Sequence, residues 1–200
     1  CISLCGYTNA GKSSLLNLLT SSNVYAKDEL FATLDSTTKE LEMNINQKVL
    51  ISDTVGFIQK LPHQLVASFH STLSDIKNSD LIVKVIDSSY PNTKMHIDTI
   101  NKTLNNLSSS DIPSIYLFNK IDLLSSEELK SLFKKFPDSY FISTYNSAGI
   151  NELINFIENT IKSSYIRDEV KISYTSMSKI DYVYSNLNVV KRINKERYVL

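Results

Sequence analysis

Gly6-Tyr7-Thr8-Asn9-Ala10-Gly11-Lys12-Ser13 lies between an apolar run, Cys1–Cys5, and a segment with an apolar stripe, Ser14–Leu19. A strand, a Gly-x-x-x-x-Gly-Lys-Ser loop and a helix in this order are typical of a phosphate-binding loop (P-loop). The two glycines let the backbone turn and approach a phosphate with no Cβ in the way. The amides of Asn9 to Ser13 then form an anion nest at the positive end of a helix. Lys12 brings a full charge to the outer phosphates, and the Ser13 hydroxyl is a ligand for Mg²⁺.

Strands and helices alternate through residues 1–163, which predicts an α/β fold. We expect a P-loop NTPase G domain: a mostly parallel sheet with one antiparallel strand and helices on both faces. In such a sheet a ligand lies at the carboxyl ends of the strands. The predicted strands are Cys1–Cys5, Lys39–Ile45, Val49–Ser52, Leu81–Ile86, Ile115–Phe118 and Tyr140–Ser143; the predicted helices are Ser14–Leu19, His63–Asn78, Met95–Leu107, Ser126–Phe136 and Asn151–Ile161.

Residues 164–200 are expected to form a small α+β C-terminal domain. Val170–Tyr174 and Val189–Leu200 are predicted as strands, and Ser178–Leu187 as a helix. A basic cluster lies near the end of this segment. It is either a solvated strand face or a contact for a polyanion. Its members are Lys191, Arg192, Lys195 and Arg197.

Asp53-Thr54-Val55-Gly56 follows the predicted strand Val49–Ser52. An Asp at this position can hold Mg²⁺ through water. The amide of Gly56 can approach a γ-phosphate closely, so this loop would order with a triphosphate and release with a diphosphate. A first switch should also supply a threonine for Mg²⁺ and the attacking water. Spacing alone does not choose among the candidates Thr33, Thr37 and Thr38.

Asn119-Lys120-Ile121-Asp122 follows the strand Ile115–Phe118. A carboxylate such as Asp122 accepts hydrogen bonds from N1–H and the exocyclic amine of guanine, whereas adenine presents a lone pair at N1. The Lys120 stem can lie against the base, and Asn119 can hold neighbouring loops. The motif therefore predicts selection of GTP over ATP. Ser143-Thr144-Tyr145 would close over the base with backbone amides.

Phe57 stands where many GTPases carry a glutamine that orients water, so slow hydrolysis is expected from this chain alone. The amide oxygen of Asn9 could hold a K⁺ ion beside the β/γ bridge and supply the charge of an arginine finger. Alternatively, Asn9 only stabilises the loop.

The composition of the chain limits which partners and which cellular location are expected for it. Its 21 basic and 21 acidic residues give a net charge of zero, so nothing global attracts it to nucleic acid or to a membrane surface. We expect a cytoplasmic monomer without a membrane span. Cys1 and Cys5 lie on one strand, too far apart to pair, and are predicted to be buried thiols. The three histidines show no zinc-ligand spacing with them. Because the sequence starts inside a predicted strand, we expect further chain upstream of it.

Three segments resemble the HflX family of ribosome-associated GTPases, within the Obg–HflX group: GYTNAGKSSLLNLLT at 6–20, DELFATLDSTTKEL at 28–41 and SDTVGFIQKLPHQLVASFHSTL at 52–73. The resemblance implies that Thr33 is the Mg²⁺ threonine of switch I and that Pro62 and His63 belong to switch II. It also implies a nucleotide-associated N-terminal domain, binding to the large ribosomal subunit, and splitting of stalled ribosomes in the GTP state.

Together, motif and resemblance give a set of residues expected to contact GTP or GDP. Mg²⁺ would be held by Ser13 and Thr33, with Asp53 behind water; Asn9, Lys12, Thr33 and Gly56 would act in hydrolysis. The full set is Gly6, Tyr7, Thr8, Asn9, Ala10, Gly11, Lys12, Ser13, Ser14, Phe31, Ala32, Thr33, Leu34, Asp35, Asp53, Thr54, Val55, Gly56, Asn119, Lys120, Asp122, Ser143, Thr144 and Tyr145.

Three other functions are compatible with parts of this pattern. Phe57 leaves open a GTP-sensing binding module with negligible turnover. An Obg-type or tRNA-modification GTPase with another partner shares the P-loop asparagine, although the LPHQLV segment argues against it. An ATP-using P-loop kinase is disfavoured by the guanine motif.

Overall fold

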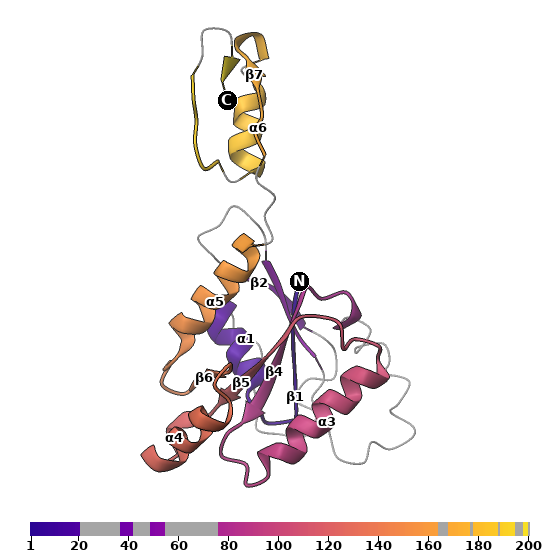
Figure 1. Cartoon of the computed structure of the whole chain (residues 1–200), viewed down its shortest axis with the longest axis vertical. Coiled ribbons are helices and arrows are strands. Elements are labelled where there is room, and N and C mark those ends of the chain that lie inside the picture. Colours follow the sequence, from indigo (N-terminus) through magenta and orange to yellow (C-terminus); the bar gives the residue numbers. More distant parts are fainter. Residues whose placement is uncertain are drawn as a thin grey trace. The chain divides into compact units, whose positions relative to one another are not determined.

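A mixed sheet forms the centre of the first part of the chain (Figure 1). Its strands are β1 (Ile2–Gly6), β2 (Thr37–Leu41), β3 (Val49–Asp53), β4 (Leu81–Asp87), β5 (Ser114–Asn119) and β6 (Tyr140–Phe141). They lie in the order β2-β3-β1-β4-β5-β6. β1 pairs in parallel with both β3 and β4, and the parallel pairing continues through β5 to β6. β2 runs antiparallel to β3, so the predicted fold class is confirmed.

The structure is a computed structural model of the chain. It describes residues 1–20, 37–41, 49–54, 76–163, 168–176, 178–187, 189–194 and 198–199. The chain divides into two units: the first contains Cys1–Glu42 and Val49–Ile154, and Asn155–Leu200 belong to the second. The division falls inside a helix, whereas the sequence predicts a domain boundary after residue 163.

The helices of the described residues follow the strands in alternation. They are α1 (Lys12–Thr20), α3 (Thr93–Asn106), α4 (Ser126–Lys135), α5 (Ile150–Ser163) and, in the second unit, α6 (Ser178–Asn186); short 3₁₀ turns are η2 (Ile121–Leu123) and η3 (Tyr174–Ser176). α3 packs against β1 and β4, where Ile97 and Ile100 join Ile82 and Ile86 in one cluster. Leu132 of α4 packs against this cluster, so α3 and α4 share a face.

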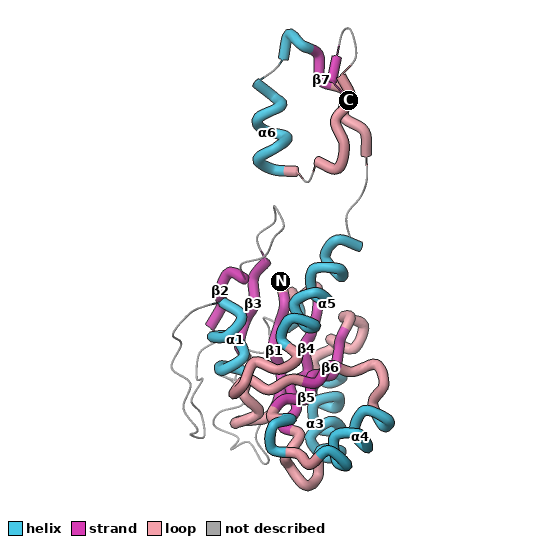
Figure 2. Tube along the Cα trace, turned by 90° about the vertical axis from the view of Figure 1, so that its left-hand side faces the viewer, coloured by secondary structure: helices cyan, strands magenta, loops and turns pink. Residues whose placement is uncertain are grey.

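α1 covers the other face of the sheet, beside β1 and β3 (Figures 1 and 2). Its side chains Leu15 and Leu16 are fully buried. Because successive strand residues point to opposite faces, β1 can place Cys5 toward α3 and Leu4 toward α1. This packing holds the first turn of α1, and with it Lys12 and Ser13, at the carboxyl end of β1.

α4 begins with a capping box, as its serines predict. The Glu128 amide donates to Ser125 Oγ at 3.3 Å, and the Ser125 amide donates to Glu128 Oε2 at 2.8 Å. The two hydrogen bonds satisfy amides that a helix end leaves open. Acidic residues in the first turn and lysines in the last turn complement the helix dipole.

Several predicted boundaries shift. β2 begins at Thr37, two residues before the predicted start at Lys39, because Thr37 pairs with Asp53 at the end of β3. β6 contains only two residues, shorter than the predicted Tyr140–Ser143. The helix predicted over His63–Asn78 lies mostly outside the described residues, although Ile76 and Lys77 are helical.

The second unit contains a small two-stranded sheet beside α6. β7 (Ile172–Ser173) pairs antiparallel with β8 (Tyr198–Val199). Ile172 and Ile180 are buried together, and Val183 packs against them. The strand predicted over Val189–Leu200 is wrong for residues 189–193, which have no regular structure; β7 offers only two residues for pairing.

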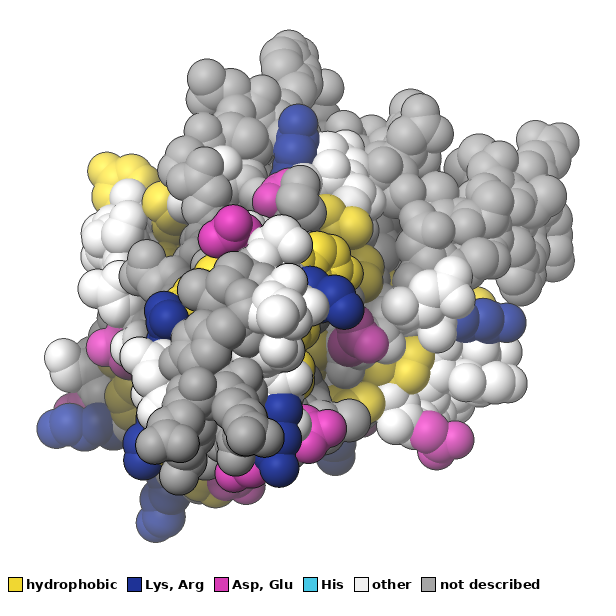
Figure 3. Space-filling view, turned by 90° about the horizontal axis from the view of Figure 1, so that it is seen from above, with side chains coloured by type: hydrophobic (Ala, Val, Ile, Leu, Met, Phe, Trp, Pro, Cys, Tyr) yellow, Lys and Arg dark blue, Asp and Glu magenta, His cyan; other side chains and the backbone are white. Residues whose placement is uncertain are grey.

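The surface of the described residues carries mixed charge. Basic and acidic side chains are interspersed on the face shown in Figure 3, in keeping with the zero net charge. Lys191 and Arg192 are exposed, and Arg192 Nε donates to Asn194 Oδ1 at 3.0 Å; Lys195 and Arg197 lie outside the described residues. In the described part of the chain, no helix has the length and apolar character that crossing a membrane requires.

The two cysteines differ in exposure. Cys5 is fully buried on β1, and burial raises the pKa of its thiol to about 12. Cys1 is exposed, so the prediction of a buried thiol at this position is wrong. Cys1 lies one residue before β1 and is not covered by the α3 cluster.

Candidate functional site

The loops after β1, β3, β4, β5 and β6 leave the same edge of the sheet, because these five strands are parallel. The motif residues Lys12, Asp53, Asn119 and Ser143 all follow or end such strands. Carboxyl ends of parallel strands are the usual ligand edge of an open α/β sheet.

The loop between β1 and α1 has the backbone that a P-loop needs. Asn9 has φ 61° and Gly11 has φ 91°, both in the left-handed region. A Cβ at Gly11 would lie 2.2 Å from Asn119 Nδ2, so the close approach of these two loops requires glycine here. The loop is closed by a hydrogen bond from the Ala10 amide to the Tyr7 carbonyl at 3.3 Å.

Lys12 lies inside this loop and is only 5% exposed. Its Nζ donates to the carbonyls of Gly6 at 3.3 Å and Tyr7 at 3.0 Å. Burial lowers the pKa of Lys12, and the nearby carboxylate of Asp53 opposes this shift. A desolvated ammonium held in place by carbonyls is a strong partner for an anion.

Ser13 and Asp53 join the P-loop to the end of β3. Ser13 Oγ donates to Asp53 Oδ2 at 2.6 Å, and Asp53 is fully buried. Thr54 fixes the same strand end, since its Oγ1 donates to the Leu4 carbonyl at 2.7 Å. A hydroxyl and a carboxylate therefore meet beside the P-loop, and both are ligand types that Mg²⁺ prefers.

Asn119 connects three loops through its side-chain amide. Nδ2 donates to the Ala10 carbonyl at 3.0 Å and to Thr144 Oγ1 at 3.3 Å, while Oδ1 accepts from the Thr144 amide at 3.1 Å. Asn119 is fully buried. One residue thus fixes the spacing between the P-loop and the loop after β6.

Asp122 is oriented by Ser143. Ser143 Oγ donates to Asp122 Oδ1, and it accepts from the amides of Tyr145 at 3.2 Å and Asn146 at 3.3 Å. The sequence predicts that the amides of Ser143, Thr144 and Tyr145 close over the base. In this structure they donate to the Ala148 carbonyl, to Asn119 Oδ1 and to Ser143 Oγ. The Tyr145 side chain is 90% exposed.

Sequence reasoning missed a second set of residues, at the end of β4. Asp87 Oδ2 and Lys120 Nζ form an ion pair at 2.7 Å. The Ser88 amide and hydroxyl both donate to the Asn119 carbonyl, at 2.9 and 2.6 Å. A signal was available in the sequence: Asp87 directly follows the predicted strand Leu81–Ile86, and polar residues at the ends of parallel strands gather at the ligand edge.

An aromatic stack links the P-loop to α3. The His96 ring lies between those of Tyr7, at 3.8 Å and 17°, and Tyr90, at 4.0 Å and 18°. Burial lowers the pKa of His96, and the charge of Asp87 opposes the shift. Within the described part of the chain, Tyr7 Oη and His96 Nδ1 are buried without a hydrogen-bond partner. A neutral imidazole is therefore favoured at this position.

Some predicted site residues cannot be placed. Residues 31–35, with Thr33, and residues 55–57, with Gly56, lie outside the described residues. The alternative threonines Thr37 and Thr38 lie in β2. There, the hydroxyls of Thr38 and Ser52 share a hydrogen bond of 2.6 Å.

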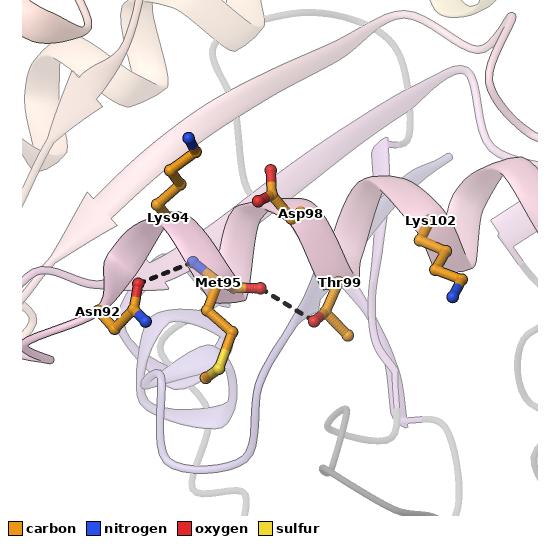
Figure 4. A pocket seen from close by; sticks show the side chains of 6 residues that line it. All are labelled: Asn92, Lys94, Met95, Asp98, Thr99 and Lys102. Carbon is orange, nitrogen blue, oxygen red and sulfur yellow. Dashed lines mark hydrogen bonds between the residues drawn. The ribbon is translucent and has the colours of Figure 1, made fainter.

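A shallow pocket lies along α3 (Figure 4). Two of its polar groups satisfy the helix itself: Asn92 Oδ1 accepts from the Met95 amide at 3.2 Å, and Thr99 Oγ1 donates to the Met95 carbonyl at 2.9 Å. Lys94, Asp98 and Lys102 complete its lining. These contacts explain the local structure and assign no chemistry to the pocket.

Comparison with known proteins identifies clear similarities. A family model described as "50S ribosome-binding GTPase" matches residues 1–120. The chain is similar to a GTPase HflX of Lacrimispora saccharolytica, at 41% identity over 178 residues that cover 89% of this chain and 42% of that protein. It is also similar to GTPase HflX of Escherichia coli, at 35% identity over 173 residues that cover 86% and 41%.

Among solved structures, the chain is similar to a GTP-binding protein from the hyperthermophilic archaeon Sulfolobus solfataricus in complex with GDP. The TM-score is 0.58 and the identity 28%, over 82% of this chain and 53% of that chain. The chain spans about two fifths of the length of these two HflX relatives.

Proposed function

Because the chain belongs to the HflX family of GTPases, we propose that it binds GTP at the carboxyl edge of its sheet and hydrolyses it to GDP and phosphate. The observation that carries this proposal is the set of contacts made by Asn119. This residue holds the P-loop at Ala10 and the loop after β6 at Thr144. A phosphate-binding motif and a guanine-binding motif are thereby held at one fixed separation, as a single nucleotide requires.

The phosphates would be bound by the P-loop amides and by Lys12. Lys12 Nζ lies against the Gly6 and Tyr7 carbonyls, a position from which it can reach the outer phosphates. Its charge would stabilise negative charge that develops during transfer of the γ-phosphoryl group.

Mg²⁺ fits the residues at the end of β3. Among the described residues no three His, Cys, Asp or Glu side chains gather as a metal cage, which agrees with an ion held mainly by hydroxyl, water and phosphate oxygens. Ser13 would be a direct ligand and Asp53 a ligand through water; the resemblance adds Thr33. The ion would neutralise negative charge on the outer phosphates.

Guanine would be selected by Asp122, whose carboxylate is oriented by the Ser143 hydroxyl. The Lys120 stem would lie against the base. Such polar recognition rejects a base whose hydrogen-bonding edge does not match, since buried polar groups would be left unpaired.

Hydrolysis by the chain alone is expected to be slow. Phe57 cannot orient water, and the proposed roles of Thr33 and the Gly56 amide in placing the attacking water depend on the switch segments. We therefore include ribosome association in the proposal: the large ribosomal subunit would supply or trigger the missing catalytic arrangement, in ribosome splitting or rescue. The family description "50S ribosome-binding GTPase" supports this partner.

We further propose a cytoplasmic monomer whose residues 1–163 and 164–200 act as G domain and C-terminal domain.

The experiment that tests this function is steady-state GTP turnover in K⁺, with and without purified large ribosomal subunits. Stimulation of phosphate release by the subunits supports a ribosome-activated GTPase. GTP binding without stimulation would mean that the partner is not the large ribosomal subunit. Failure to bind GTP would overturn the assignment, and binding without turnover would leave a GTP-sensing module.

Asn9 is expected to confer K⁺ dependence. Its backbone is left-handed and its side chain is exposed, so Asn9→Gly keeps the loop conformation while removing the amide oxygen. If this oxygen holds K⁺ beside the β/γ bridge, the variant should lose about tenfold in turnover in K⁺ and little in Na⁺. An unchanged K⁺ to Na⁺ ratio would mean that Asn9 only stabilises the loop.

A further inference from the structure

The end of β4, which lies between β1 and β5 in the sheet, also holds the guanine motif. In the sheet register, Asp87 lies beside Asn119. The Ser88 amide and hydroxyl donate to the Asn119 carbonyl, at 2.9 and 2.6 Å. The Asp87 carboxylate then reaches Lys120, one residue further along the chain, at 2.7 Å. The backbone and the side chain of this motif are thus held by consecutive residues.

Asp87 itself is held rigidly. Its Oδ1 accepts from the Ser89 amide at 2.9 Å and from Ser89 Oγ at 2.6 Å, which leaves Oδ2 directed at Lys120. The Asp87 side chain is 17% exposed and that of Lys120 is 29% exposed. A partly buried carboxylate with both oxygens engaged differs from a mobile surface pair, which contributes little.

Lys120 needs such support because its backbone is unusual. It has φ 65° and ψ 34°, a left-handed conformation that a long L side chain seldom adopts. Conformations of this kind persist where surrounding contacts determine them, and they occur often at functional sites. Ser88 holds the backbone just before Lys120, and Asp87 holds the ammonium at the end of its side chain.

We propose that Asp87 is a positioning residue for base recognition. By holding the ammonium of Lys120, the carboxylate fixes the aliphatic stem where the nucleotide base lies against it and keeps Asp122, two residues on, in register with the guanine edge. The inference rests on the proposed GTP-binding function and deepens it. It extends the base site to β4, a strand with no recognised nucleotide motif.

A double-mutant cycle on the 200-residue chain tests the proposal, with GDP and inosine diphosphate (IDP) as probes in titration calorimetry. IDP lacks the exocyclic amine that Asp122 reads, so the ratio of the two affinities reports base recognition. Asp87→Asn should lower GDP affinity about tenfold, typical of losing one charge-assisted hydrogen bond, and reduce the preference for GDP over IDP at least about threefold. In a Lys120→Met background the same change should cost less than about twofold, because Asp87 acts through Lys120.

Two further variants complete the experiment. Asp138→Asn, an exposed carboxylate after α4, is the matched control and should leave both affinities unchanged. Asp87→Glu keeps the charge and should retain GDP affinity within about threefold. It serves as the test variant if Asp87→Asn does not fold, as judged by a melting curve.

The outcomes distinguish a failure of the positioning role of Asp87 from a failure of the proposed GTP-binding function. If the parent chain binds GDP with a preference over IDP but Asp87→Asn behaves like the control, the positioning role is wrong. An equal loss in the Lys120→Met background, or an Asp87→Glu loss as large as that of Asp87→Asn, also overturns it. If the parent chain binds no guanine nucleotide, the proposed function fails first.

Discussion

A Lys12→Met chain should lose GTP hydrolysis by at least about 100-fold, equivalent to about 2.7 kcal/mol of transition-state stabilisation. The methionine side chain is nearly as long as that of lysine, but the substitution removes the charge that Lys12 holds beside the Gly6 and Tyr7 carbonyls. Without this charge, the negative outer phosphates would face the buried carboxylate of Asp53 with less compensation. Phosphate release under single-turnover conditions measures the loss.

The fold should survive this change. Burial already disfavours the charged form of Lys12, as its lowered pKa shows, so an apolar side chain of similar size is tolerated there. Lys130→Met, an exposed lysine on α4, is the matched control and should keep full turnover. Normal hydrolysis by Lys12→Met, with an unchanged melting temperature, would remove Lys12 from the mechanism.

An Asp122→Asn chain should reverse its base preference, from GTP to xanthosine triphosphate. Xanthine carries a carbonyl oxygen where guanine carries the exocyclic amine, so an amide donor pairs with it and a carboxylate does not. We expect roughly a 100-fold loss of GTP affinity and a gain for the xanthine nucleotide, within the range of polar mismatches in such sites. Competition binding with the two triphosphates measures both changes.

The structure makes this substitution specific. Ser143 Oγ donates to Asp122 Oδ1, and an asparagine oxygen at the same position can accept that hydrogen bond. The new NH₂ group is then left for the base. Asp111→Asn, an exposed carboxylate after α3, is the control and should keep the GTP preference. Retention of that preference by Asp122→Asn would contradict the base assignment.

Contiguous motifs made the ligand edge predictable from the sequence. The P-loop, Asp53 and Asn119–Asp122 each carry their chemistry within a few adjacent residues, and each follows an apolar run that can only be a buried strand. Parallel pairing then brings the strand ends together, whatever the detailed register. The mixed sheet was predictable for the same reason.

Contacts that depend on register were not predictable. Asp87 acquires its partner because β4 and β5 align Asp87 with Asn119, and nothing in the sequence near Asp87 states this alignment. The strand predicted over Val189–Leu200 failed at residues 189–193 for a related reason. The β-branched residues there favour extended structure, but β7 contains only Ile172 and Ser173, which pair with Val199 and Tyr198.

The hydrogen bond between Asn119 Nδ2 and the Ala10 carbonyl closes a loop across 109 positions of the sequence. For a flexible chain, the conformational entropy of such a closure corresponds to about 4 kcal/mol. The folding of the sheet offsets this entropy loss, so nucleotide binding does not have to. Once one end of the nucleotide is seated, its other end therefore meets partners already at high effective concentration, so the two halves of the ligand should bind far more tightly when joined than as separate fragments.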